Sequence, residues 1–282
     1  MSNARVVPMS IDDYHRDTTA ISHSGLDEVI EDPTDYYEKR ILKLYGDEDT
    51  DAFAFGRKLH DALLQPGEFG AGVVTIPETA LNHQGHRKGP KWKAFEAKHA
   101  GRVLLKSDEP LARMIASAAR SSVVRNLIAN DGDYEQSVFW HNDEFDVDCR
   151  CRFDFIHLDR ETIVDIKSTK GGGSPQWNSQ TVFNFGYHRQ AAFYCDGAEE
   201  LYGIRPKFIF IFMSKKPPYR VDIHDLTDDY IELGRAENRS GLKKYAECRK
   251  TGIWLPETHD EIVTLSPPGY ARHSNEWSYV KP

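Results

Sequence analysis

The sequence predicts an α/β (α+β) fold with a central mixed sheet flanked by helices. Helical periodicity, period-2 alternation and one continuous apolar run support this prediction. They occur in the order helix, three strands, helix, strand (αβββαβ). The expected helices are 107–129 and 181–202, and the expected strands are 134–141, 145–156, 162–167 and 207–213.

The length of 282 residues is enough for a single domain with a well-buried core. We expect one domain over 1–282, composed of a helical N-terminal part (14–106), a core (107–226), and a C-terminal helix with an irregular tail (227–282). Aromatic residues make up 11% of the chain, which argues against disorder.

The charge and the cysteines restrict the class of protein. The net charge of −8 counts mildly against a nucleic-acid partner, but Lys and Arg can still gather in one groove. The four cysteines include no C-x-x-C pair, so zinc and iron–sulfur spacings are absent and buried apolar roles are expected. No apolar run has membrane-spanning length, and the N-terminus lacks the apolar core of a signal peptide. We therefore expect a cytoplasmic protein without a membrane partner.

The N-terminal part contains two informative helices. Ser22 or Ser24 can cap a helix that begins near Gly25, and a DNA phosphate is the alternative partner for these hydroxyls. Residues 51–64 form a second amphipathic helix that carries His60. A lone helical histidine is more often structural than a metal ligand.

Two further segments have open or weaker interpretations. Trp92 lies among Lys88, Lys91 and Lys93, which is compatible with a solvated face or with a surface that follows a nucleic-acid backbone. The segment 168–180 is rich in Gly, Ser and Pro, and we expect a mobile loop beside the site.

The expected hairpin 145–167 carries the most informative residues. In its first strand, alternation places Asp154 on the face opposite a mostly apolar set, Val147, Cys149, Cys151, Phe153 and Phe155. In its second strand, Asp165 and Lys167 lie two residues apart and share a face. Two carboxylates can share hard divalent cations, and an ammonium group beside them can position a water molecule.

The remaining elements complete the expected fold. Ser107 is a plausible N-cap of the helix 107–129, and Gln190 lies one turn from Tyr194 on the next helix. We expect a strand at 219–226, and a final helix over 227–251 that is broken or curved near Ser240-Gly241.

Five segments, taken in order, resemble the PD-(D/E)xK nuclease superfamily, and in particular its RecE-like branch, the exonuclease VIII-type domain also seen in phages. The similarity covers about residues 14–254. The segments are ISHSGLDEVIEDPTDYY from Ile21, FGRKLHDALLQPGEF from Phe55, CRCRFDFI from Cys149, IVDIKST from Ile163 and YHRQAAFY from Tyr187.

The resemblance implies a restriction-endonuclease-like core and assigns roles to individual residues. It implies metal ligation by His60, Asp154, Asp165 and the carbonyl of Ile166. It implies catalytic roles for Lys167, Asp165, Asp154, Glu135 and Gln190. The expected DNA contacts are Ser22, Ser24, Arg152, Thr169 and Tyr194.

The function implied is a Mg²⁺-dependent deoxyribonuclease, with Mn²⁺ as a substitute and without an iron–sulfur cluster. We expect a 5′-to-3′ exonuclease on double-stranded DNA ends that assembles as a ring and works with a single-strand annealing recombinase. Such an enzyme would suit a bacterial or phage-encoded recombination system.

Three other functions remain open at this stage. The protein could be an endonuclease of the same superfamily, a non-catalytic DNA-binding protein with a decayed site, or a metal-dependent enzyme on another substrate. The intact set of Asp154, Asp165 and Lys167 argues against a decayed site.

Overall fold

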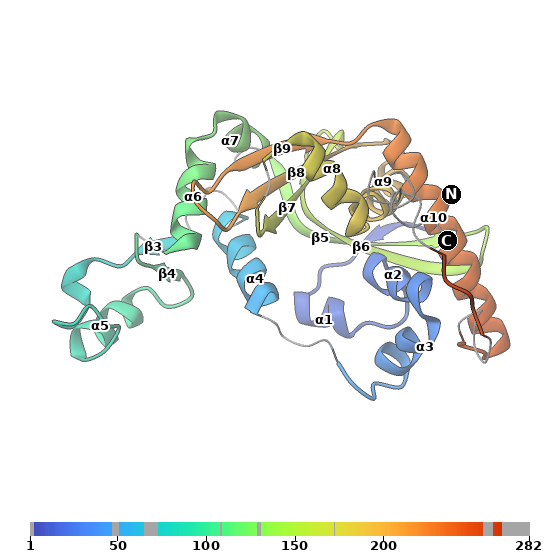
Figure 1. Ribbon diagram of the computed structural model, residues 1–282, viewed down its shortest axis with the longest axis horizontal. Coiled ribbons are helices and arrows are strands. Elements are labelled where there is room, and N and C mark those ends of the chain that lie inside the picture. The colour runs from blue at the N-terminus through green and yellow to red at the C-terminus, as the bar shows by residue number, and fades with distance from the viewer. Residues whose placement is uncertain are drawn as a thin grey trace, which may run out of the picture.

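A mixed sheet forms the centre of the protein in the computed structural model, which describes residues 3–46, 51–64, 73–107, 109–128, 131–171, 173–255 and 262–266 (Figure 1). The strand order is β1-β5-β6-β7-β8-β9, and β2 also pairs with β6. The neighbours β5, β6 and β7 are antiparallel, β7 and β8 are parallel, and β8 and β9 are antiparallel. The predicted fold class is therefore confirmed.

Five strands of this sheet agree closely with the expected ones, and the short strands β1 and β2 were not predicted. The strands are β1 (Arg5–Val6), β2 (Ile21–Ser22), β5 (Gly132–Asn142), β6 (Val147–His157), β7 (Thr162–Thr169), β8 (Lys207–Ser214) and β9 (Val221–Asp225).

Helices cover both faces of the sheet and enclose two apolar clusters. One cluster unites α2 (His23–Glu31), α3 (Pro33–Tyr36), α9 (Tyr187–Tyr202) and α10 (Asp228–Thr251) with β5, β6 and β8. The other unites α4 (Asp51–Leu63), α6 (Pro110–Arg120) and α7 (Ser122–Ile128) with β7 and β8. The shorter helices are α1 (Ile11–Arg16), the π-helix η1 (Tyr37–Ile41) and α8 (Pro175–Asn184). The four cysteines are free and buried, as expected.

Two of the expected helices are each divided into two. The helix predicted over 107–129 breaks at Ser121, whose ψ of 116° is extended, and it begins at Pro110 with Glu109 rather than Ser107 as the N-cap. The helix predicted over 181–202 comprises the end of α8 and all of α9. Between these helices Gly186 has a φ of 65°, a left-handed conformation that glycine adopts without steric cost.

Two other predictions need correction. Residues 168–180 are not all loop, because α8 begins at Pro175 and is capped by the hydroxyl of Ser174. The helix α10 continues through Gly241 without a break. A Cβ at this glycine would lie 2.8 Å from Cγ1 of Ile30, so the glycine permits close packing of α2 on α10.

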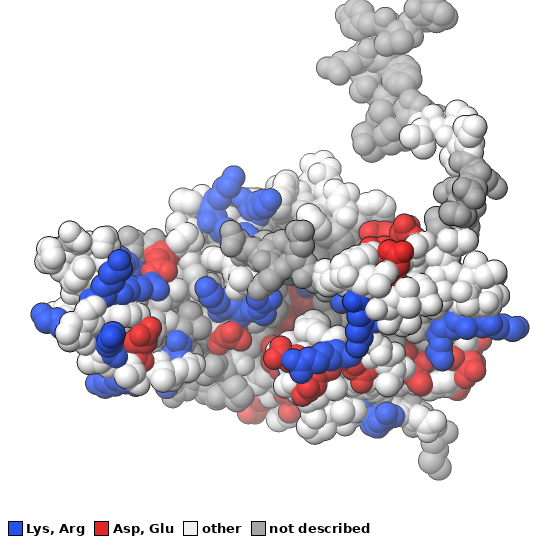
Figure 2. Space-filling view, turned by 90° about the horizontal axis from the view of Figure 1, so that it is seen from below, with Lys and Arg blue, Asp and Glu red and all other residues white. Residues whose placement is uncertain are grey.

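A small unit, residues 73–107, projects from the main body beside α4 and α6 (Figure 1). It contains the parallel pair β3 (Val73–Thr75) and β4 (Val103–Leu105), the 3-10 turn η2 (Glu78–Ala80) and α5 (Pro90–Lys98). Lys and Arg side chains gather over this unit in Figure 2. We call residues 73–107 the arm. No helix in the described part of the chain is long and apolar enough to cross a membrane.

Candidate active site

The site begins where two neighbouring strands stop pairing. The strands β6 and β7 pair at Phe155↔Val164 and Ile156↔Ile163. Beyond these pairs, the backbone N–H of Ile166 donates to Oδ2 of Asp154 at 2.9 Å. Buried backbone groups need hydrogen-bond partners. The side chain of Asp154 here supplies the acceptor that the backbone of a paired strand would otherwise supply.

A change of face on β6 accompanies this opening. Alternation predicts Phe153 and Phe155 on the same side, but this is wrong. Phe153 packs with Tyr194 of α9, whereas Phe155 belongs to the cluster around α4, α6 and α7. Asp154 lies between the two phenylalanines and turns toward the gap between the strands.

His60 completes a first group of three. Its Nε2 donates to the carbonyl oxygen of Ile166 at 2.8 Å, and its Nδ1 lies 3.5 Å from Oδ1 of Asp154. The sequence-predicted ligands His60, Asp154 and the Ile166 carbonyl are thus brought together from α4, β6 and β7.

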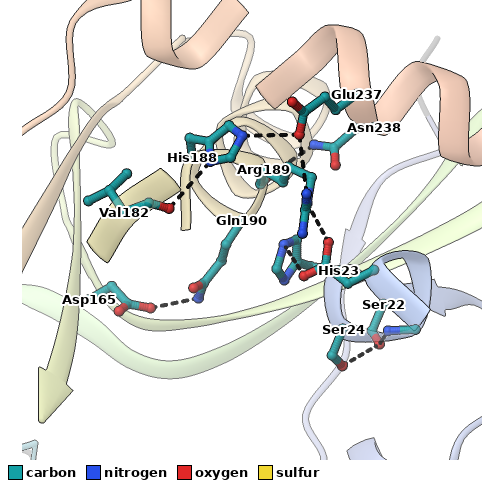
Figure 3. A network of polar contacts seen from close by, with 12 residues as sticks. Ser22, His23, Ser24, Asp165, Val182, His188, Arg189, Gln190, Glu237 and Asn238 are labelled. Carbon is teal, nitrogen blue, oxygen red and sulfur yellow. Dashed lines mark hydrogen bonds and ion pairs between the residues drawn. The ribbon is translucent and has the colours of Figure 1, made fainter. Parts of the chain in front are cut away.

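Asp165 and Lys167 form a second group on the same strand. The Nζ of Lys167 lies 2.8 Å from Oδ1 of Asp165 and 4.9 Å from the centroid of the Tyr187 ring. The amide of Gln190 donates to Oδ2 of Asp165 at 2.7 Å (Figure 3). The side chain of Asp165 is only 2% exposed, so the site is recessed.

Burial and mutual proximity shift the pKa values of these groups. Burial raises the pKa of Asp154 to about 6, His60 opposes the shift, and Asp165 adds to it. Burial alone would lower the pKa of His60, but Asp154, the Ile166 carbonyl and Asp165 outweigh it and raise this pKa. Burial likewise opposes the charge on Lys167, but Asp165 and Tyr187 raise its pKa.

These groups are suited to a divalent cation only as a mixed set of ligands. Among the described residues, no three His, Cys, Asp or Glu side chains form a metal-binding group by themselves. The Ile166 carbonyl supplies the additional oxygen beside His60 and Asp154. Oδ1 of Asp165 is buried beside the ammonium of Lys167, and a carboxylate oxygen has a second lone pair for a further ligand bond. The donors present therefore fit a hard divalent ion.

Nε2 of His60 donates its proton to the carbonyl of Ile166, so the neutral ring can offer the lone pair of Nδ1, which faces Asp154, to a metal ion. The raised pKa of His60 favours a second proton on the ring. A proton and a cation therefore compete at this histidine.

A polar network holds α9 against α2 and α10, and sequence reasoning missed the contacts among its members (Figure 3). Arg189 contacts Asp27 through Nε at 2.7 Å and Glu237 through Nη1 at 3.2 Å. His188 contacts the same Glu237 carboxylate at 3.0 Å. Arg189 adjoins Gln190, so these contacts fix the residue that donates to Asp165.

His23 is a further buried group that sequence reasoning overlooked. Burial, followed by the charges of Lys167 and Arg189, lowers the pKa of His23 to about 3, so its ring stays neutral. The only signal was its place between Ser22 and Ser24, which we interpreted as capping residues.

Glu135 and Arg152 contact each other. Nε of Arg152 lies 2.8 Å from Oε2 of Glu135, and Nη1 donates to the hydroxyl of Ser137 and the carbonyl of Met9. Tyr134 pairs with Phe155 and Gln136 with Phe153, so Glu135 lies opposite Asp154 on the neighbouring strand. The φ of Glu135 is 52°. A catalytic role for Glu135 and a DNA contact by Arg152 stay predictions, and the guanidinium is already engaged within the protein.

The other predicted DNA contacts have structural partners. The hydroxyl of Ser22 accepts from the N–H of Gly25 and lies 3.2 Å from that of Ser24, which confirms the capping interpretation. Thr169 donates to the carbonyl of Gly171. The ring of Tyr194 packs between Phe153 and Phe208. Contacts of these residues with DNA stay predictions.

The comparison with protein families agrees with this geometry. A family model described as a PDDEXK-like domain of unknown function (DUF3799) matches residues 22–261. The chain belongs to this family, whose domain is of the PD-(D/E)xK nuclease type. The expected superfamily is thus confirmed. No curated protein sequence matches the chain significantly.

One solved structure shares the whole fold. The crystal structure of a protein from Eubacterium rectale, described as a "Putative exonuclease", superposes with a TM-score of 0.62 at 14% identity. The match covers 95% of this chain and 99% of that chain. The structures of SSO0001 and of VC1899 from Vibrio cholerae match with TM-scores of 0.28 and 0.22, at 12% and 11% identity. These two matches cover 67% and 89% of this chain, and 84% and 58% of those chains.

Proposed function

We propose that this protein is a divalent-metal-dependent deoxyribonuclease, with Mg²⁺ as the ion, that degrades double-stranded DNA from its ends in the 5′-to-3′ direction. The observation that supports this proposal is the convergence of His60, Asp154 and the Ile166 carbonyl beside the Asp165–Lys167 pair. A divalent ion bound by His60, Asp154, Asp165 and the Ile166 carbonyl would supply Lewis-acid activation of a phosphodiester and of water.

Lys167 has a defined part in this proposal. Its raised pKa favours the ammonium form, which can hold a water molecule and offset negative charge that develops on the phosphoryl oxygens. The pairing with Asp165 and the ring of Tyr187 fix its position. These features favour orientation of the water by Lys167 over its deprotonation.

Gln190 acts through Asp165 in this scheme. Its amide donates to Oδ2 and thereby limits the rotation of the carboxylate. The ring assembly and the annealing recombinase remain predictions from the family resemblance. Light scattering and co-purification with a candidate recombinase would test them.

A single digestion series tests the proposed function. Linear duplex DNA labelled at the 5′ or the 3′ end is incubated with the protein, with Mg²⁺ or with EDTA, beside closed circular DNA. The expected result is early release of the 5′ label, intact circles and no cleavage in EDTA. Cleavage of circles would indicate an endonuclease, and early release of the 3′ label would reverse the polarity. Activity unchanged in Asp165→Asn would contradict the proposed site.

A further inference from the structure

The arm is strongly basic in an acidic protein. Residues 73–107 carry seven Lys or Arg and two carboxylates, whereas the whole chain carries 36 Lys and Arg against 44 Asp and Glu. Figure 2 shows these positive side chains over the projecting unit, while much of the negative charge on this face lies over the main body. The arm therefore has a formal net charge of +5, whereas the remaining residues together have −13.

The lysines of the arm are available to a partner. Lys88, Lys91, Lys93 and Lys98 are exposed, and in the described part of the chain their side chains make no hydrogen bond or ion pair. Arginines of the main body, by contrast, are commonly neutralised, as Arg235 is by Asp196. Glu96 is the one carboxylate on α5, and the excess of positive charge favours an anionic partner.

The helix α5 arranges three of these lysines on the edges of one face. Trp92 and Phe95 point into the small core of the arm, with Ile76 and Ala80. At 100° per residue, Lys91 and Lys98 lie on one edge of the exposed face, Lys93 lies on the other, and Ala94 and Ala97 lie between them. Small residues flanked by lysines let a phosphate backbone approach closely. Trp92 is buried and is not available to stack on bases.

The strand β4 of the arm packs against α4, the helix that carries His60. Leu105 of β4 lies in the same apolar cluster as Leu59 and Leu63 of α4, the helix that carries His60. A ligand held by the arm is therefore held in a defined position relative to the site.

We propose that the arm binds the phosphate backbone of the duplex that is being processed, through Lys88, Lys91, Lys93 and Lys98. This inference rests on the proposed function and adds to it a binding surface outside the recessed site. The surface contributes affinity without base recognition, because lysine contacts with phosphates are independent of sequence.

The test replaces all four lysines with glutamine in the full-length chain. The matched control replaces Lys43, Lys207, Lys243 and Lys250, which are exposed on the main body and give the same change in net charge. A third variant replaces the four arm lysines with arginine. Binding to a linear duplex is measured against salt concentration in an Asp165→Asn background, and kcat and KM are measured in the active protein.

The arm variant with glutamine is expected to bind at least tenfold more weakly at physiological salt, and its salt slope is expected to fall by about 2 to 4, close to one for each lost phosphate contact. KM is expected to rise, while kcat stays within twofold. The arginine variant and the main-body control are expected to behave like the unmodified chain. If the unmodified chain cuts DNA but the arm variant matches the control, the arm proposal alone is wrong. If the unmodified chain neither binds nor cuts DNA, the proposed function itself is wrong.

Discussion

The carboxylate of Asp154 accepts the backbone N–H of Ile166 at 2.9 Å, where β6 and β7 cease to pair. The side chain of Asp154 thus provides the hydrogen-bond acceptor that a paired strand would supply at this point, and it is also a candidate metal ligand. The backbone carbonyl of Ile166 becomes available to His60 for the same reason.

Replacing Asp154 by asparagine should separate stability from activity. Asparagine keeps an acceptor for Ile166 but carries no charge. We expect nuclease activity to fall at least about 100-fold, because metal-ligand and electrostatic contributions of this size are typical. The control is Asp148→Asn on the same strand, at an exposed carboxylate that contacts His141. Equal loss of activity in both variants would contradict the prediction.

The metal-free stability of the same variant should depend on pH. The folded pKa of Asp154, about 6, exceeds its ordinary value of 3.8, so the folded state binds more protons between these pH values. The stabilising effect of this group is therefore lost as the pH rises through this window. Asp154→Asn should have a higher Tm than the unmodified protein in EDTA above pH 6, and this advantage should vanish near pH 4. Thermal melts in EDTA across this range would measure it.

Divalent ions should stabilise the protein more at higher pH. Protons on Asp154 and His60 compete with the cation, and the pKa values of both groups are raised. We expect the Tm increase caused by Mg²⁺ or Mn²⁺ to be small at pH 5 and larger at pH 8. An increase that is equal at both pH values, or that persists in a His60→Ala, Asp154→Asn double variant, would contradict this metal site.

Lys167→Gln should reduce kcat more than it reduces DNA affinity. The substitution removes the ammonium beside Asp165 but keeps a polar side chain. We expect kcat to fall about 100-fold or more, with DNA binding within threefold, since the role assigned to Lys167 acts on the reacting groups. Lys216→Gln, at an exposed lysine, provides the control. A rise in KM without a change in kcat would instead indicate a substrate-binding lysine.

Gly186→Ala should disturb the site from a distance. Both Gly186 and Gly203 have a left-handed φ, so alanine at either position should cost about 1 kcal/mol. At Gly186 the new Cβ would also lie 2.4 Å from Nη2 of Arg189, whereas at Gly203 it meets open space. Gly186→Ala should therefore lower Tm and kcat more than Gly203→Ala, because Arg189 adjoins Gln190. Urea unfolding and kinetics of both variants would measure the difference.

Much of the site is local in sequence, and that part was predictable. Asp165 and Lys167 share a face because side chains on a strand alternate with a period of two. The helix with His60 follows from its apolar periodicity. The superfamily resemblance then joined His60, Asp154 and Gln190 into one expected site, and their contacts in the structure agree with this grouping.

Other features depend on contacts between distant segments. The network of Asp27, Arg189 and Glu237 was missed because its members lie on three helices and none has a local signal. The break at Gly186 was missed because apolar periodicity continues across the glycine. The sequence shows that the segment with Lys88, Lys91 and Lys93 is basic, but whether Trp92 is exposed or buried could not be inferred from its neighbours in the chain.

The sequence alone determined the order of elements, the helix that bears His60, and the adjacency of Asp165 and Lys167, because periodicity and local spacing encode these directly. Only the tertiary structure decided that β6 and β7 separate at Asp154, that the Ile166 backbone faces His60, and that the basic segment projects as an arm. Strand pairing, packing and burial depend on contacts between residues that are remote in the chain, and these contacts cannot be predicted from local sequence patterns.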